Sequence, residues 1–256
     1  WVGVVGDASM VAPLTALATA SGGEATGADD PGPGDGVQSA AIGALAMLDD
    51  GAGMNALMDL ARHGSVSVRK AAVFWVGQSD EPRARALVRT IIDDGRESET
   101  VRGAAIFALG QGDNQTAADA AFLRAAFDRM PSDRLKDRIL MSVSQGDAPD
   151  GTRWLLDRAR DDRQPIEVRR KAVFWAGQGH ARVADLTALY GSVHEPRLRE
   201  HVIFVLSQRN EEAATDELMD IARSDTDRAM RRKALFWLAQ KNDPRVTKLI
   251  AEIVAR

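Results

Sequence analysis

The chain contains 256 residues, of which 45% are hydrophobic and 27% are charged, a composition that excludes a disordered or membrane-like protein. Its formal net charge of -4 argues against bulk electrostatic binding to nucleic acid or anionic lipid, although it is compatible with a local basic patch. The sequence has no cysteine, which excludes disulfides and thiolate metal sites and leaves the cellular compartment open.

The first 20 residues are expected to contain the end of one repeat and one helix. Residues 1–3, Trp-Val-Gly, copy residues 75–77, so we interpret residues 1–7 as the last part of an earlier repeat. On this interpretation the chain begins partway through a repeat. Residues 8–20 are expected to form a helix, although Pro13 disfavours its first turn.

Residues 21–36 are rich in Gly, Pro and Asp, a composition that cannot pack a core and predicts a flexible insertion. A calcium site formed by Asp29, Asp30 and Asp35 is the alternative, but their spacing matches no cation-binding loop. No apolar run of the chain approaches the ~20 residues that a bilayer-spanning helix requires, so we expect no membrane insertion.

From residue 37 onward one segment of the sequence is repeated, and residues 230–240, MRRKALFWLAQ, are a representative copy. Its first positions recur every 30 to 34 residues, at Val37, Val68, Val101, Leu135, Val168, Leu198 and Met230. A nearly constant period of this size is typical of a solenoid, in which each repeat stacks on its neighbours.

A second amphipathic segment lies between the copies, at residues 54–62, 82–94, 152–162, 182–190, 216–225 and 244–256. Its apolar residues have helical spacing, and Gly, Asp and Pro separate it from the repeated segment, with Asp or Gln expected as N-caps. Each repeat is therefore a helix A, a short turn and a helix B. We expect residues 1–256 to form a single all-α solenoid, a right-handed superhelix of about seven helix pairs.

The repeated pattern resembles HEAT repeats, including those first noticed in bilin-lyase-like proteins. The matching features are Val68-Arg69 and Ala72 at the start of helix B, Val76-Gly77 near its end, and Asp80-Glu81-Pro82-Arg83 before the next helix A. The match covers residues 37–256, and extracytoplasmic bacterial HEAT proteins have similar Phe-Trp-Leu-x-Gln segments. The resemblance implies an armadillo-like solenoid that serves as a general scaffold, without identifying a partner.

When the copies are aligned, each of their positions can be assigned to a face of helix B. Positions 1, 5 and 9 lie four residues apart and are apolar, so we expect them to pack against helix A. Position 6 is β-branched or Leu and should face a neighbouring helix B, while the small residues at position 10 allow close helix approach. The Trp residues at position 8 are interpreted as packing toward the core, at Trp75, Trp175 and Trp237.

Position 7 carries large apolar residues where HEAT-like sequences usually have a polar one, namely Phe74, Phe107, Met141, Phe174, Phe204 and Phe236. At about 100° per residue, this column lies roughly 160° from the centre of the core face. Two interpretations stay open. The side chains either seal adjacent B helices together, or form an exposed ridge on the concave surface that binds an apolar peptide or helix.

Two polar columns have structural interpretations. Position 11 is Gln in six copies and is expected to bond the free carbonyls at the helix end, with a polar rim for a ligand as the alternative. Position 2 is basic in six copies and is expected to form ion pairs between repeats. The candidate partners in the preceding turns are Glu99, Asp133, Glu167, Glu195 and Asp227.

Further basic residues gather at positions 3 and 4, closer to the open face of helix B. These candidates for partner binding are Lys70, Arg138, Arg170, Lys171, His201, Arg232 and Lys233. They are denser in the C-terminal half of the chain, so an acidic partner should bind there.

The sequence contains no glycine-rich phosphate loop, nucleophile elbow or His-Glu-x-x-His signature. His194-Glu195 is similar to the His-Glu pairs of HEAT-like iron hydroxylases, but that site needs four pairs and this chain has one. No residues match the sites of HEAT-like DNA glycosylases or bilin lyases. We therefore expect no catalytic residue, no metal and no cofactor.

These patterns predict a non-enzymatic, monomeric scaffold that binds a protein or peptide on its helix B surface, through the position 7 column and the basic residues beside it. One alternative is an adaptor or regulatory subunit that binds nucleic acid or an enzyme through the C-terminal basic cluster. The others are a HEAT-like enzyme such as a lyase and a structural spacer. Steep salt dependence of binding would favour nucleic acid.

Overall fold

A computed structural model describes residues 8–20, 36–48, 51–111, 115–146 and 150–254 of the chain. These residues contain no strand; the α-helices are α1 (Val11–Thr19), α2 (Val37–Ala46), α3 (Ala52–His63), α4 (Val66–Gly77), α5 (Pro82–Asp93), α6 (Glu99–Leu109), α7 (Ala117–Ala126), α8 (Asp133–Gln145), α9 (Gly151–Arg160), α10 (Ile166–Gln178), α11 (Val183–Ser192), α12 (Pro196–Ser207), α13 (Glu212–Ser224), α14 (Arg228–Leu238) and α15 (Pro244–Val254). Short 3-10 helices cover Ala8–Met10 and Phe127–Arg129. The repeat end expected at residues 1–7 and, apart from Gly36, the insertion expected at residues 21–36 lie outside the described residues.

The helices alternate in the predicted order, which confirms the all-α solenoid. The odd-numbered helices α1 to α15 are A helices, and the even-numbered helices α2 to α14 are the seven copies of helix B. Among the described residues, no helix combines the length and apolar character that a membrane span needs.

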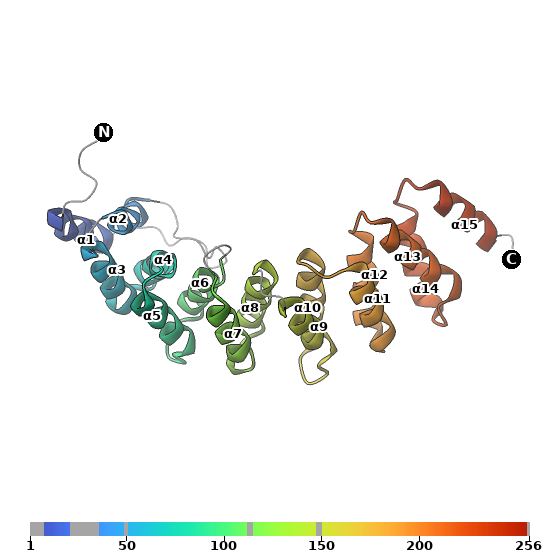
Figure 1. The fold of residues 1–256 in the computed structure, drawn as a ribbon, viewed down its shortest axis with the longest axis horizontal. Helices are drawn as coiled ribbons and strands as arrows, with labels where there is room; N and C mark the ends of the chain where they lie inside the picture. The colour runs from blue at the N-terminus through green and yellow to red at the C-terminus, as the bar shows by residue number, and fades with distance from the viewer. Residues whose placement is uncertain (1–7, 21–35, 49–50, 112–114, 147–149, 255–256) are drawn as a thin grey trace. The chain divides into compact units, whose positions relative to one another are not determined.

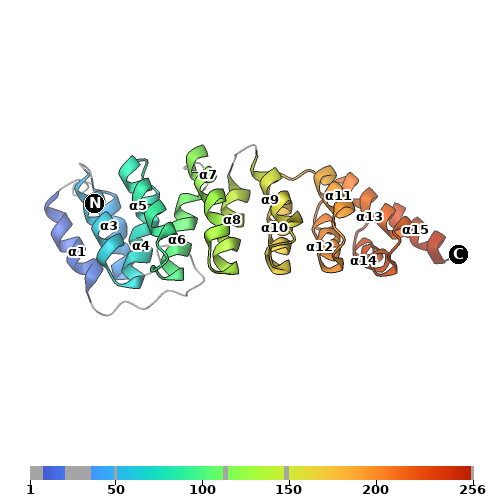
Figure 2. The ribbon, with the colours of Figure 1, turned by 90° about the horizontal axis from the view of Figure 1, so that it is seen from below.

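The chain divides into two compact units, Trp1–Ala148 and Pro149–Arg256. In the first unit, the B helices α2, α4, α6 and α8 pack side by side, and the A helices form a second layer (Figure 1). In the second unit, α10, α12 and α14 form the same kind of row beside α9, α11, α13 and α15 (Figures 1 and 2). The core of each unit therefore lies between its two layers.

Positions 1, 5 and 9 of helix B are buried in every copy except at Val37, which is 69% exposed. Val37 differs because it is the first residue of α2, whereas each other helix B begins two residues before position 1. Position 6 is also buried in every copy except at Leu235, which is half-buried. The predicted core face is thus confirmed.

Serine side chains cap three of the four B helices of the first unit, α4, α6 and α8. The Oγ atoms of Ser65, Ser98 and Ser132 accept hydrogen bonds from the backbone N–H three residues further on, at 3.4, 3.3 and 3.3 Å. These bonds satisfy N–H groups that have no partner inside the helix. The expected aspartate cap is present at Asp227, whose Oδ1 accepts a hydrogen bond from the Ala229 N–H at 2.7 Å. The serine caps were not among the N-caps predicted from the sequence.

The Pro-Arg dipeptide that begins two A helices, α5 and α15, has a physical role in joining repeats. The proline occupies the first turn, where no backbone N–H is needed, and the arginine reaches the preceding helix A. From α5, Arg83 donates to Asn55 Oδ1 of α3 at 2.7 Å. From α15, Arg245 donates to Glu212 and Asp216 of α13 at 2.8 Å each.

Small residues at position 10 let consecutive B helices approach closely. A Cβ atom added at Gly77 in α4 would lie 2.5 Å from the Cβ of Ala108 in α6, closer than real Cβ atoms approach. An added Cβ would also collide with the next helix at two other position 10 glycines, Gly110 with Ser142 and Gly177 with Val205. In all three cases the contact lies at position 8 of the next copy, so positions 8 and 10 form the seam between B helices.

We expect Gly77→Ala to lower the free energy of unfolding of the first unit by about 1 to 3 kcal/mol, because the methyl group overpacks this seam. Gly103→Ala, in the same unit, is the matched control: its Cβ would have only Leu135 Cδ2 nearby, at 3.8 Å. That variant should gain about 0.5 to 1 kcal/mol from the helix propensity of alanine. Thermal or urea denaturation measures both, and a stabilised Gly77→Ala protein would contradict the close seam.

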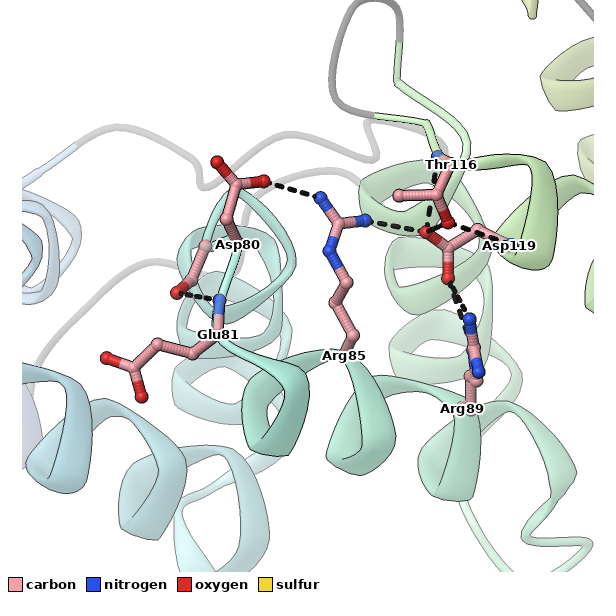
Figure 3. Close-up of polar contacts among 7 residues, drawn as sticks. Asp80, Glu81, Arg85, Arg89, Thr116 and Asp119 are labelled. Carbon is pink, nitrogen blue, oxygen red and sulfur yellow. Dashed lines mark hydrogen bonds and ion pairs between the residues drawn. The ribbon is translucent and has the colours of Figure 1, made fainter.

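A buried carboxylate joins two A helices of the first unit. Asp119 on α7 is completely buried and accepts from Arg85 at 2.6 Å and from Arg89 at 2.6 and 3.2 Å, both on α5 (Figure 3). Thr116 donates its hydroxyl to the same carboxylate at 2.5 Å, and Asp80 holds the other side of Arg85 at 2.9 Å. Burial alone would raise the pKa of Asp119, but the hydrogen bonds from Thr116 and Arg89 and the two positive charges lower it below its ordinary value.

Asp119→Asn should lower the free energy of unfolding of the first unit by about 3 kcal/mol, because two guanidinium groups lose their buried carboxylate. The control is Asp93→Asn, which removes an ion pair to Arg129 of 2.8 Å from a side chain that is 43% exposed and should cost less than about 1 kcal/mol. Urea denaturation distinguishes the two, and equal losses would argue against a buried charge network. Because the pKa of Asp119 is lowered, its contribution to stability is present above about pH 4 and is lost as the pH falls through the lowered pKa.

Candidate functional site

The basic column at position 2 of helix B is structural. Arg69 donates to both carboxylate oxygens of Glu97 at 3.0 and 2.9 Å, and Arg199 donates to Asp225 at 2.6 Å. Each partner belongs to the following repeat, so ion pairing between repeats is confirmed. The partners of Arg69 and Arg199 are Glu97 and Asp225, which are not among the expected residues Glu99, Asp133, Glu167, Glu195 and Asp227.

Other members of this column bond backbone carbonyls at the end of their own helix A. Arg102 donates to the Ile92 carbonyl and Arg169 to the Ala159 carbonyl, both at 2.9 Å. The last turn of a helix leaves its carbonyls without an internal partner, and a guanidinium group satisfies them. These position 2 arginines therefore stabilise the repeats and are not available to a ligand.

The position 7 side chains are neither fully buried nor a free ridge. They are half-buried in five copies, at Phe74, Phe107, Met141, Phe174 and Phe204. The Phe74 and Phe107 rings stack with centroids 6.3 Å apart, which links α4 to α6. Phe236 on α14 is 60% exposed, since no helix B follows α14 in the described residues to cover it. Phe74, Phe107 and Phe204 therefore help to join neighbouring B helices while staying partly exposed, and binding of a partner by this column stays a prediction.

The Trp residues at position 8 do pack, but between B helices rather than against helix A. The Trp75 ring covers Gly43 of α2, where an added Cβ would lie 3.2 Å from Trp75 Cζ2. In the second unit, the Trp237 ring of α14 lies 5.3 Å from the Phe204 ring of α12. Both Trp side chains are half-buried, which corrects the expectation that they turn into the core.

The position 11 Gln column shows the expected helix-end contact at Gln240, whose Nε2 donates to the Phe236 carbonyl at 3.4 Å. Gln208 instead donates to the Ser207 hydroxyl at 3.1 Å. Both Gln side chains are exposed, so these bonds contribute little to stability.

The basic candidates at positions 3 and 4 differ in exposure. Lys70 is only 2% exposed and cannot present its charge to a partner, because α4 is packed between α2 and α6. Arg138, Arg170 and His201 are half-buried, and three candidates are exposed: Lys171, Arg232 and Lys233. The exposed members of this candidate set therefore all lie in the second unit, which agrees with the predicted gathering of these residues toward the C-terminus.

The B helices of the second unit form one open groove of about 430 Å³. Its lining comes from α10, α12 and α14 and consists of Arg170, Arg197, Glu200, His201, Phe204, Lys233 and Trp237. Four of these residues are predicted candidates, namely Arg170, His201, Phe204 and Lys233. The other candidates lie on α4, α6 and α8 of the first unit, or on α10 and α14 beside the groove.

Aromatic rings form the inner part of the groove. The imidazole of His201 lies 5.6 Å from the Phe204 ring, and the Phe204 ring lies 5.3 Å from that of Trp237. All three side chains are half-buried and line the groove, so part of each ring is accessible. The row runs from α12 to α14 and offers a continuous aromatic surface.

Charged groups form the outer part of the groove. Arg170 pairs with Glu167 at 2.9 Å, and Lys233 pairs with Glu200 at 3.3 Å. These four side chains are between 37% and 60% exposed, so both ion pairs are weak and exchange readily. Arg197 is exposed and has no ion pair within the described residues.

Sequence patterns missed three of the lining residues. Arg197 precedes position 1 of its copy, and Glu200 lies in a position 3 column that has no constant character, so neither belongs to a recurring set. Arg197, Glu200 and His201 are spaced i, i+3 and i+4, which places them on one face of a helix and could have indicated the groove. Trp237 was assigned to the core.

His201 is uncharged at neutral pH. Burial, together with the positive charges of Arg170 and Lys171 and against the opposing charge of Glu167, lowers the pKa of its imidazole to about 4. The inner surface of the groove is therefore neutral, and its charge resides on the outer arginine, lysine and glutamate side chains.

We expect NMR titration of His201 to give a midpoint near pH 4 rather than its ordinary 6.5. Arg170→Gln should raise this midpoint, because it removes a neighbouring positive charge. Since protonation is disfavoured in the folded state, the free energy of unfolding should decrease as the pH falls from 6.5 toward 4. A wild-type midpoint at 6.5 would contradict the buried environment of His201.

No group of three or more His, Asp or Glu side chains that could hold a metal ion occurs in the part of the chain that the structure describes. His194 and Glu195 are both exposed and lie just before α12.

Comparison with known proteins identifies the family of this chain. The sequence matches HEAT repeats over residues 54–144 and 152–239, and no curated protein matches it. Among solved structures, it is similar to human deoxyhypusine hydroxylase in complex with glycerol, with 18% identity over 96% of this chain and 94% of that chain and a TM-score of 0.41. Because the two HEAT segments span more than half of the chain, this protein belongs to the HEAT-repeat family.

Proposed function

We propose that this protein is a non-enzymatic scaffold that binds a protein or peptide in the groove of α10, α12 and α14. The proposal rests on the aromatic row of His201, Phe204 and Trp237, which packing between helices leaves partly exposed in the groove. Exposed aromatic groups that are surrounded by charged side chains are typical of protein-binding surfaces. HEAT repeats also generally mediate protein binding, which agrees with this assignment.

A groove in the first unit supports binding less well. It has a volume of about 520 Å³, lies between α1 and α3, and its lining residues include Val11, Asn55, Asp59 and His63. No aromatic side chain other than His63 lines it, so it lacks the large rings that anchor most protein partners.

Site-directed photo-crosslinking tests this function. A photo-reactive phenylalanine analogue replaces Phe236, which is exposed and lies 5.1 Å from Trp237 at the edge of the groove. The same analogue at Ile250 on α15 is the control, because this exposed position lies on the A layer of the same unit. We expect the Phe236 probe to give a discrete adduct with a cellular protein that the Ile250 probe does not give.

A further substitution ties the adduct to the groove. Trp237→Ala should reduce the yield of the Phe236 adduct by about tenfold, because loss of an aromatic anchor typically costs more than 1.4 kcal/mol of binding. Circular dichroism and a melting curve establish that the variant is folded. Equal adducts from both probes, or an adduct unaffected by Trp237→Ala, would argue against binding in this groove.

A further inference from the structure

The groove of the second unit has a charge opposite to that of the chain as a whole. Its lining includes three cationic side chains, Arg170, Arg197 and Lys233, and one carboxylate, Glu200. The complete chain, in contrast, has a formal net charge of -4. An excess of positive charge in a groove of an acidic protein favours an occupant of negative charge.

We propose that this groove binds an acidic peptide segment that carries one apolar anchor side chain. This inference rests on the peptide-binding function proposed above and specifies the chemistry of the partner. The anchor packs against Phe204 and Trp237, and carboxylates on either side of it pair with Arg197 and Lys233. The volume of about 430 Å³ holds a few side chains rather than a folded element.

The inner surface of the groove selects an uncharged anchor. Phe204 and Trp237 present ring faces, and the imidazole of His201 that continues the row is neutral at physiological pH. A carboxylate placed on these neutral rings would lose its hydration, and a cation would face the positive charges of Arg170, Arg197 and Lys233, whereas an apolar side chain removes ring surface from water.

The outer charges can change partners at little cost. Lys233 pairs with Glu200 at 3.3 Å, but these side chains are 49% and 39% exposed. Arg197 is exposed and has no ion pair within the described residues, so it is available to a ligand without displacing another group. An acidic segment would therefore gain ion pairs while releasing only one weak internal pair.

A nucleic acid fits this surface less well. Glu167 and Glu200 lie beside Arg170 and Lys233, so two carboxylates interrupt the positive charge along the groove. A continuous phosphate backbone would meet both of them, whereas a peptide can place its carboxylates only where the cations lie.

Fluorescence anisotropy with defined probes tests the proposal on the complete chain. The probes are three short labelled peptides with a central leucine flanked by glutamates, glutamines or lysines, and a single-stranded DNA oligonucleotide. The double variant Arg197→Glu/Lys233→Glu reverses two exposed groove charges. The matched control is Arg153→Glu, an exposed arginine on α9 that lies outside the groove lining. Melting curves verify that the variants are folded.

We expect the glutamate peptide to bind at least about tenfold more tightly than the glutamine peptide, and the lysine peptide to bind weakest. Charge reversal in the groove should weaken glutamate-peptide binding at least about tenfold, and Arg153→Glu should leave it unchanged. Added salt should weaken binding of the glutamate peptide in the wild-type protein more than in the double variant.

Several outcomes would overturn the acidic-peptide assignment. These are equal binding of the three peptides, tighter binding of the oligonucleotide, no binding of any peptide, or a dimer by light scattering that dissociates on charge reversal. The crosslinking experiment separates these from failure of the proposed function: a groove-dependent Phe236 adduct together with no preference for glutamate would retain the scaffold and reject only its acidic partner.

Discussion

The close approach of consecutive B helices is the constraint on which the rest of each unit depends. Gly77 in the first unit and Gly177 in the second leave no room for a side chain where they meet the next helix. At this separation, position 6 is buried in every copy except at Leu235, and the large side chains of positions 7 and 8 are half-buried except at Phe236. A wider spacing would expose apolar surface along the whole row, at about 25 cal/mol per Å².

Charged groups provide the second constraint by joining A helices and closing helix ends. Arg102 and Arg169 occupy the same position in different units and satisfy the same kind of carbonyl at the end of helix A. Asp119 joins two A helices, because Arg85 and Arg89 of α5 would lack a buried counter-charge without its carboxylate. Most of the repeated basic residues therefore stabilise the stack, which leaves few cations for binding.

The groove follows from these two constraints. Stacking brings Arg170, His201 and Lys233, which belong to three successive copies, onto one surface. The same stacking only half-buries the side chains of Phe204 and Trp237, so part of each ring is available to a ligand. The candidate site is thus not a motif in one copy but a product of the register between copies.

The periodicity of the sequence by itself determined the order of the helices, the buried faces of helix B and the close helix contact at the small residues of position 10. Each of these features is a local pattern that recurs from copy to copy. The periodicity also indicated that basic residues gather toward the C-terminus. Only the tertiary structure decided that Lys70 is covered while Lys233 is exposed, and that Trp237 lines a groove instead of the core. The exposure of a side chain at a given position depends on the helices beside it, so the pattern within one copy could not predict it. Arg197 lies outside the recurring columns, so the pattern could not assign it to the groove either.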